Sequence, residues 1–328
     1  MLTLLTGGCG FIGSHLADRL LGHGHSVTVL DNLATGRREN LAHLAGHPRL
    51  RIVLADVADP GSYGDAFAGV EWVFHLAGLA DIVPSIQKPW GYLQTNVSGT
   101  VGVLEAARAA GVRRFVYAAS SSCYGLPDSV PTSESAPIRS EYPYALSKYM
   151  GEEAVLHWAR IYRLPAVSLR LFNVFGPRSR TTGAYGAVFG VFLAQKLKGV
   201  PFTVVGDGTQ TRDFVHATDV AAAFVRAAES DVCGEAMNVG AGAEHSVNEI
   251  ADLLGGDKVH IPKRPGEPDR TCADIAKIRR LLGWSPVMPF ADGVRDLAAR
   301  IEHWRDAPVW TPDSIASATQ DWFRYLSR

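Results

Sequence analysis

Three glycines with the spacing GxxGxxG restrict the fold of this chain more than any other feature of its sequence. Leu2–Thr6 is an apolar run of strand length, and the glycines follow it directly, at the start of the helix-like segment Phe11–Leu21. A strand that turns into a helix through glycines lets a pyrophosphate approach the backbone N–H groups of the first helical turn. The sequence therefore predicts a dinucleotide site formed by Gly7, Gly10, Phe11, Ile12 and Gly13.

Strand-like and helix-like segments alternate through the first half of the chain. The strand-like runs are apolar throughout, as expected where helices cover both faces of a parallel sheet. We therefore predict an α/β fold with a doubly wound parallel sheet of the Rossmann type. The predicted strands after Leu2–Thr6 are Ser26–Leu30, Arg51–Leu54, Trp72–Leu76, Phe115–Ala119 and Ala166–Leu171, and the later predicted helices are Asn96–Ala109 and Tyr144–Arg163.

Turns rich in glycine and proline become more frequent after Gly176. We expect residues 1–175 to form the dinucleotide-binding domain. Residues 176–328 are expected to form mainly a smaller α/β lobe for the substrate, although the chain can cross back between the lobes. The tail from Asp306 to Arg328 is expected to be one final packed helix, with the aromatic side chain of Trp322 in the core.

Composition argues against several classes of function. Lys and Arg number 32 against 33 Asp and Glu, so the chain has no positive field with which to hold polymeric nucleic acid. No run approaches the roughly 18 apolar residues of a membrane span, and the N-terminus lacks the basic region of a signal peptide. We expect a cytoplasmic protein without a membrane partner. The four cysteines lack CxxC spacing, which indicates neither a metal site nor a disulfide framework.

Acidic residues end two of the predicted strands. Asp31 follows Val27–Leu30 at the distance from the glycines where a carboxylate accepts hydrogen bonds from an adenosine ribose. Because a carboxylate there repels a 2′-phosphate, it favours NAD over NADP, although Arg37 and Arg38 leave NADP open. Asp56 and Val57 follow the next strand, where they can meet the adenine or simply end a strand.

Tyr144 and Lys148 lie four residues apart at the start of a predicted helix, so both side chains share one face. A nearby ammonium and the positive nicotinamide ring stabilise a phenolate, which turns a tyrosine into a usable base near neutral pH. Ser120 ends a predicted strand at the sheet edge where ligands bind, and its hydroxyl can share a substrate proton with Tyr144. The YxxxK pair alone is common by chance; its place after the glycines and Ser120 makes it informative.

With these motifs in order, the chain resembles the extended short-chain dehydrogenase/reductases along essentially its whole length. Within them it is similar to the NAD-dependent epimerase/dehydratase family, and most of all to UDP-glucose and UDP-N-acetylglucosamine 4-epimerases. The matching stretches are TGGCGFIGSHL, Asp31-Asn32, HLAG, TNVSGT, AASSSCYG, YALSK, LRLFNVFGPR, GDGTQTRDFVH and RPGEPDRTCAD. The resemblance implies that NAD takes a hydride from C4 of a nucleotide-linked sugar and returns it to the other face.

The resemblance also implies a role for individual residues. Tyr144 is the implied base, Lys148 lowers its pKa and holds the nicotinamide ribose, and Ser120 is the hydroxyl partner. Further implied cofactor contacts are Asn32, Leu76, Ala77, Gly78 and Asn96, besides the residues already named. Implied substrate residues are Ser85, Ser121, Ser122, Asn173, Glu267, Val204 against the uracil, Arg212 and Arg264 on the diphosphate, and Thr271, whose small side chain leaves room for an acetamido group.

Several alternatives remain open at this point. A UDP-glucuronate 4-epimerase would share every catalytic residue. A 4,6-dehydratase or a reductase fits less well, because dehydratases of this kind carry Thr-Asp-Glu, and the related decarboxylases Thr-Ser-Glu, where this chain has Ser120-Ser121-Ser122. An NAD(H)-sensing regulator is the non-enzymatic reading. By resemblance we expect a homodimer in which Thr95–Ala110 and Ser147–Arg163 pair into a four-helix bundle; core packing within one monomer would look the same.

Overall fold

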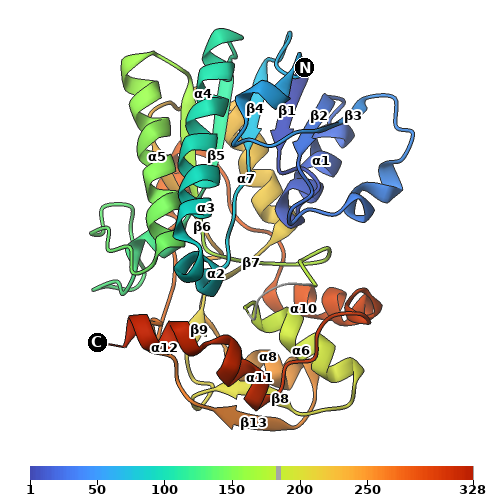
Figure 1. Cartoon of the computed structure of the whole chain (residues 1–328), viewed down its shortest axis with the longest axis vertical. Helices are drawn as coiled ribbons and strands as arrows, with labels where there is room; N and C mark the ends of the chain where they lie inside the picture. Colours follow the sequence, from blue (N-terminus) through green and yellow to red (C-terminus); the bar gives the residue numbers. More distant parts are fainter. Residues whose placement is uncertain (182–185, 328) are drawn as a thin grey trace.

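A seven-stranded, wholly parallel sheet forms the centre of the larger lobe (Figure 1). The computed structural model describes residues 1–181 and 186–327. Because the strand order reverses direction between β1 and β4, a crevice for ligands is expected at the carboxyl ends of these strands. The predicted α/β Rossmann fold is confirmed. The order is β11-β6-β5-β4-β1-β2-β3, with β1 (Leu2–Thr6), β2 (Ser26–Asp31), β3 (Leu50–Leu54), β4 (Trp72–His75), β5 (Arg114–Ser120), β6 (Ala166–Leu171) and β11 (Ala236–Val239).

Helices cover both faces of this sheet. Helix α1 (Phe11–Gly22) packs beside α7 (Ala217–Glu229) on one face, and α4 (Gly99–Ala109) packs beside α5 (Pro143–Ile161) on the other. All six residues of β6 are buried, and four of them are apolar. The other two, Ser168 and Arg170, donate hydrogen bonds to buried Glu152.

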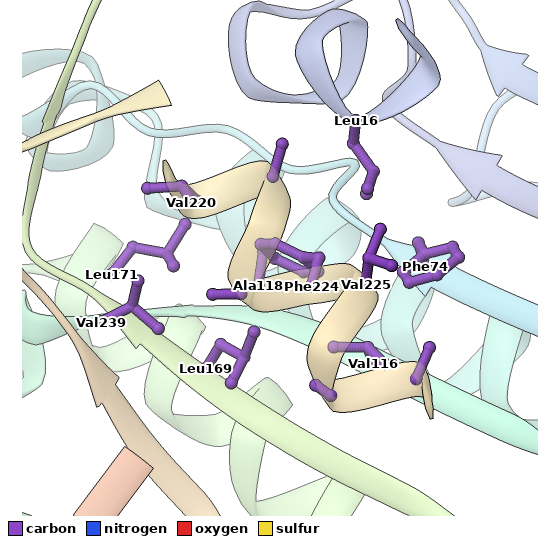
Figure 2. Close-up of a cluster of buried hydrophobic side chains, with 14 of the residues drawn as sticks. Leu16, Phe74, Val116, Ala118, Leu169, Leu171, Val220, Phe224, Val225 and Val239 are labelled. Carbon is purple, nitrogen blue, oxygen red and sulfur yellow. The ribbon is translucent and has the colours of Figure 1, made fainter. Parts of the chain in front are cut away.

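The core beneath α7 joins residues that are distant in sequence (Figure 2). Phe224 and Val225 of α7 lie against side chains from the sheet, and Leu16 of α1 closes the cluster from above. Phe224 has no exposed surface, and complete burial of such a side chain stabilises the fold by roughly 1.5–3 kcal/mol. The sheet side chains in this view are Phe74, Val116, Ala118, Leu169, Leu171 and Val239.

The chain crosses between the two lobes more than once. After β6 it builds part of the smaller lobe, returns through α7 and β11 to the sheet, and then leaves again. Residues 217–239 therefore belong to the larger lobe, although they follow position 176. The remaining strands and helices of this half are β7 (Asn173–Phe175), α6 (Val188–Leu197), β8 (Phe202–Val205), β9 (Thr211–Arg212), β10 (Phe214–His216), β12 (His245–Ser246), α8 (Val247–Leu254), β13 (Lys258–Ile261), α9 (Ala276–Leu282) and α10 (Phe290–Ala299).

The C-terminal tail is not the single helix that we predicted. It contains α11 (Pro312–Ala318) and α12 (Gln320–Leu326), while η5 (Ile301–Trp304) ends just before it, and Arg328 lies outside the described residues. Thr311 and Ser314 form a capping box that starts α11 with Pro312 in its first turn. Because this capping box starts a new helix within the tail, the tail cannot be one continuous helix. Helix α12 contacts α2 (Ile82–Gln87) of the larger lobe.

Short helical segments complete the larger lobe: η1 (Arg38–Leu44), η2 (Pro60–Tyr63), α3 (Pro89–Leu93), the π-helical turn η3 (Gln94–Ser98) and η4 (Ser121–Tyr124). No helix in the described part of the chain is long and apolar enough to cross a membrane.

Candidate active site

The glycine turn between β1 and α1 leaves no room for side chains. Gly7 has a φ of +71°, and a Cβ there would lie 2.7 Å from the backbone N of Ala77. A Cβ on Gly13 would lie 2.2 Å from the carbonyl oxygen of Gly7. Because the N–H groups of the first turn of a helix have no intrahelical partner, this bare turn fits a pyrophosphate. Gly8 also has no room, since its Cβ would lie 2.6 Å from Val29, and sequence reasoning missed it.

Asp31 is fixed beside this turn. Its carboxylate accepts hydrogen bonds from the backbone N–H of Cys9 at 2.9 Å and of Leu33 at 2.8 Å. Burial raises the pKa of Asp31, while these two hydrogen bonds oppose the rise. Each carboxylate oxygen keeps a further lone pair that can accept from a ribose hydroxyl. Gly36 faces the same carboxylate, because a Cβ there would lie 2.9 Å from it; this contact also escaped the sequence reading.

The guanidinium of Arg37 is held by residues outside the dinucleotide site. It donates to Thr181 Oγ1 at 2.8 Å and lies 2.9 Å from Nε2 of His303. An arginine held by these two groups is poorly placed to neutralise a 2′-phosphate, which favours NAD further. Nearby, Asn32 Nδ2 donates to Asp56 at 2.9 Å, and Val57 is buried, so these ends of β2 and β3 are tied together.

Asn96 is held by hydrogen bonds within the protein. Its side chain is fully buried, its Oδ1 accepts from Leu79 N at 2.8 Å, and its Nδ2 donates to Leu79 O at 3.0 Å and to Ser147 Oγ at 2.9 Å. Both N–H groups of the Asn96 amide therefore have partners within the protein, and its contact with the cofactor stays a prediction. Through Leu79 and Ser147, Asn96 ties the loop after β4 to α5, and a Cβ on Gly78 in this loop would lie 2.9 Å from its Oδ1.

Tyr144 and Ser120 meet at the carboxyl end of β5. Pro143 starts α5, so Tyr144 lies in the first turn of that helix. Burial raises the pKa of Tyr144, and hydrogen bonds that the Ser120 and Ser122 hydroxyls donate to its oxygen act against this rise. The two serine hydroxyls lie 2.7 Å apart. The arrangement joins three hydroxyl groups through which a proton can move.

Lys148 lies one helical turn beyond Tyr144 and is only 6% exposed. Burial lowers the pKa of its ammonium to about 7, whereas the carboxylate of Glu152 opposes the change. The ammonium lies 4.3 Å from the centre of the Tyr117 ring, and Glu152 is itself paired with buried Arg170 at 2.6 Å. A cation with a pKa near neutrality can change its charge readily in response to its neighbours.

A cavity of about 420 Å³ opens beside Tyr144. Two arginines on its wall share one carboxylate: Arg212 lies 2.8 Å and Arg264 lies 3.5 Å from oxygens of Glu267. Such paired guanidinium groups can bind a diphosphate. The other predicted residues that line the cavity are Ser120, Ser121, Ser122, Asn173 and Thr271.

Comparison with known proteins agrees with this geometry. The model of the NAD dependent epimerase/dehydratase family matches residues 3–240. The chain belongs to this family. It is 38% identical over 314 residues to a UDP-glucose 4-epimerase of Mycolicibacterium smegmatis, covering 93% of this chain and 99% of the relative. As a member of this NAD-dependent family, the protein uses NAD as its cofactor.

Two solved structures of epimerases are also similar to this family member. A UDP-N-acetylglucosamine 4-epimerase from Methanobrevibacter ruminantium, in complex with UDP-N-acetylmuramic acid, has a TM-score of 0.86 and 32% identity over 92% of this chain and 97% of its own. A UDP-glucuronic acid 4-epimerase from Bacillus cereus, with UDP-glucuronic acid and NAD, has a TM-score of 0.84 and 30% identity over 92% of this chain and 99% of its own.

Two predicted substrate residues of this epimerase/dehydratase family member do not line the cavity. Val204 is fully buried, whereas Thr203 and Val205 on either side of it form part of the cavity wall. Since side chains alternate along β8, the side chain of Val204 points away from the cavity wall, and its contact with the uracil stays a prediction. Ser85 is also fully buried, and its hydroxyl donates to Ile82 O at 2.6 Å; Ile82 is the α2 residue on the wall.

Six aromatic residues of the cavity wall were missed, among them Tyr142 and Trp322. Tyr142 stacks on Tyr144, with ring centroids 6.3 Å apart and planes 12° apart. The position of Tyr142 two residues before Tyr144 is the sequence signal that could have identified it as a site residue. Trp322 comes from α12, and nothing in the sequence relates it to residues so far away.

Proposed function

We propose that this family member is a UDP-sugar 4-epimerase. The observation that carries the proposal is that one cavity holds both a tyrosine bonded to serine hydroxyls and a pair of arginines around one carboxylate. The first group suits proton transfer at a sugar hydroxyl, and the second suits a diphosphate. The similarity to UDP-sugar 4-epimerases over more than nine-tenths of the chain supports the same assignment.

The residues that would hold NAD are the glycine turn around Gly7 and Gly13, Asp31 at the adenosine ribose, and Lys148 at the nicotinamide ribose. When bound, NAD would supply the hydride acceptor for C4 of the sugar, and the hydride would return from it to the opposite face. Tyr144 takes the proton of the C4 hydroxyl and gives it back, while Ser120 shares that proton through its hydroxyl. Lys148 stabilises the phenolate of Tyr144 by its charge.

At the diphosphate, Arg212 and Arg264 offer forked donors. Their shared partner Glu267 holds both guanidinium groups in place, which reduces the side-chain freedom that is lost when the substrate binds. The negative charge of the diphosphate exceeds that of one carboxylate, so the arginines favour the substrate.

An uncharged sugar fits the cavity better than glucuronate. Among the described residues of its wall, Arg212 and Arg264 are the only Lys or Arg side chains, and Glu141 and Glu267 add two carboxylates. A sugar carboxylate would thus lack a cation once the diphosphate occupies the arginines. Ser120–Ser122 carries no carboxyl group, which argues against dehydration. The small side chain of Thr271 leaves room for an acetamido group, so UDP-N-acetylglucosamine is included among the proposed substrates.

The decisive experiment incubates purified protein separately with UDP-glucose, UDP-N-acetylglucosamine and UDP-glucuronate and identifies the sugars by NMR. We expect C4 epimers of the first two sugars, no net formation of NADH, and loss of product in Tyr144→Phe. Epimerisation of UDP-glucuronate alone would instead establish the glucuronate enzyme. If all three sugars returned unchanged with NAD supplied, the UDP-sugar assignment would be wrong.

A further inference from the structure

The C-terminal helix α12 contributes one aromatic side chain to the cavity. Trp322 is 5% exposed and lies on the wall together with Arg264 and Glu267. Its indole Nε1 donates to the carbonyl oxygen of Pro265 at 2.7 Å. The guanidinium carbon of Arg264 lies 5.2 Å from the centre of the indole ring. One side chain thus contacts both the backbone and the arginine of the loop that presents the candidate diphosphate site.

The loop from Arg264 to Arg270 is held differently at its two ends. At the far end, Arg270 pairs with Thr211 in an isolated β-bridge, and the N–H of Thr211 donates to Asp269 O at 2.9 Å. At the near end, Trp322 supplies both contacts just described. Removing the indole would therefore loosen the Arg264 end and leave the other end fastened to β9.

Helix α12 is also hydrogen-bonded to the larger lobe. Asp321 accepts a hydrogen bond from Gln87 Nε2 of α2 at 2.8 Å, and Ile82 of the same helix lines the cavity. Figure 1 shows α12 beneath α2 and beside the smaller lobe. The helix that carries Trp322 is thus fixed on the side of the NAD-binding lobe, so it can hold the loop in a defined place.

We propose that Trp322 is a positioning residue for the substrate diphosphate, acting through Arg264. The inference rests on the proposed UDP-sugar function. An arginine stacked on a fixed ring loses less freedom on binding than a mobile one, and the ring attracts its charge. Trp322 therefore strengthens binding of the diphosphate and leaves proton transfer at Tyr144 unchanged.

The test compares two ligands that differ only in phosphate. UDP and uridine are titrated into the wild-type protein, Trp322→Ala and Trp322→Phe by calorimetry. Loss of the stacked ring and the hydrogen bond should weaken UDP about tenfold in Trp322→Ala. Uridine should change by less than about twofold, and Trp322→Phe, which keeps a ring, should lie between. In turnover assays KM should rise by a similar factor while kcat stays within about twofold.

A matched control and a double variant separate this role from a general loss of structure. Tyr325→Ala changes an exposed aromatic of the same helix and should leave both ligands unaffected. Arg264→Ala combined with Trp322→Ala should bind UDP no more weakly than Arg264→Ala alone. Equal weakening of UDP and uridine, or unchanged UDP binding in Trp322→Ala, would overturn the proposal. Wild-type protein that bound no UDP would instead remove the proposed function, and the role of Trp322 with it.

Discussion

Lys148 combines a charge with nearly complete burial, and this makes its effect on stability depend on pH. Burial lowers its pKa from 10.5 to about 7. Below the folded pKa the side chain is protonated in both states, so the whole cost of burying the charge falls on the folded state. Between pH 7 and 10.5 the folded state sheds the proton and the cost declines.

We therefore expect Lys148→Met to raise the melting temperature more at about pH 6 than at about pH 9, while abolishing most turnover at both. Thermal unfolding of the two proteins at both pH values measures this difference. Lys198→Met changes an exposed lysine and should show no such dependence. A gain that is equal at the two pH values would contradict the prediction.

Thr271 is the residue that we propose sets the room for the sugar. Its hydroxyl lies 3.4 Å from Asn173 Oδ1, and both residues line the cavity. We expect Thr271→Tyr to lower kcat/KM for UDP-N-acetylglucosamine by about 10- to 100-fold relative to UDP-glucose, because overfilling a packed site costs about 1–3 kcal/mol. Competition of the two sugars in one reaction measures the ratio. An unchanged ratio would place the acetamido group elsewhere.

At the scale of the element, helix α1 offers two glycines with opposite surroundings. A Cβ on Gly13 would lie 2.2 Å from the Gly7 carbonyl, whereas a Cβ on Gly22 would meet nothing within 4 Å. Gly13→Ala should weaken NAD binding more than tenfold and destabilise the protein by about 1–3 kcal/mol. Gly22→Ala should stabilise it by about 0.5–1 kcal/mol and leave NAD binding unchanged. Titration with NAD and unfolding in urea measure both effects in the two variants. Similar NAD affinity and similar stability of the two variants would contradict the close packing of the turn.

At the scale of the whole molecule, α5 leaves an apolar stripe uncovered. Leu146 is 45% and Met150 41% exposed, and they lie one turn apart on the same face. We propose that this stripe and α4 form the homodimer interface expected from the resemblance. Met150→Glu should then shift a dimer towards monomer in light scattering, whereas Val287→Glu, at a residue 82% exposed outside both helices, should not. A wild-type monomer at the same concentration would rule the interface out.

Much of the larger lobe and of the candidate site could be predicted from the sequence because the signals are local. The apolar runs, the glycine spacing and the four-residue step from Tyr144 to Lys148 each depend on a short stretch of chain. Parallel strands then bring their carboxyl ends to one edge, which is why Ser120, read as a strand end, does lie beside Tyr144.

The tertiary structure decided the rest, because it depends on contacts between distant segments. The sequence around Val204 does not show which face of β8 is directed into the smaller lobe's core. A shift of one residue along the strand turns each side chain to the opposite face. The amide of Asn96 donates to Leu79 and to Ser147, and only the packing of α5 brings Ser147 within reach. Likewise, the return of α7 and β11 to the sheet, and the place of Trp322 at Arg264, follow from packing across more than fifty residues of chain and not from any local pattern.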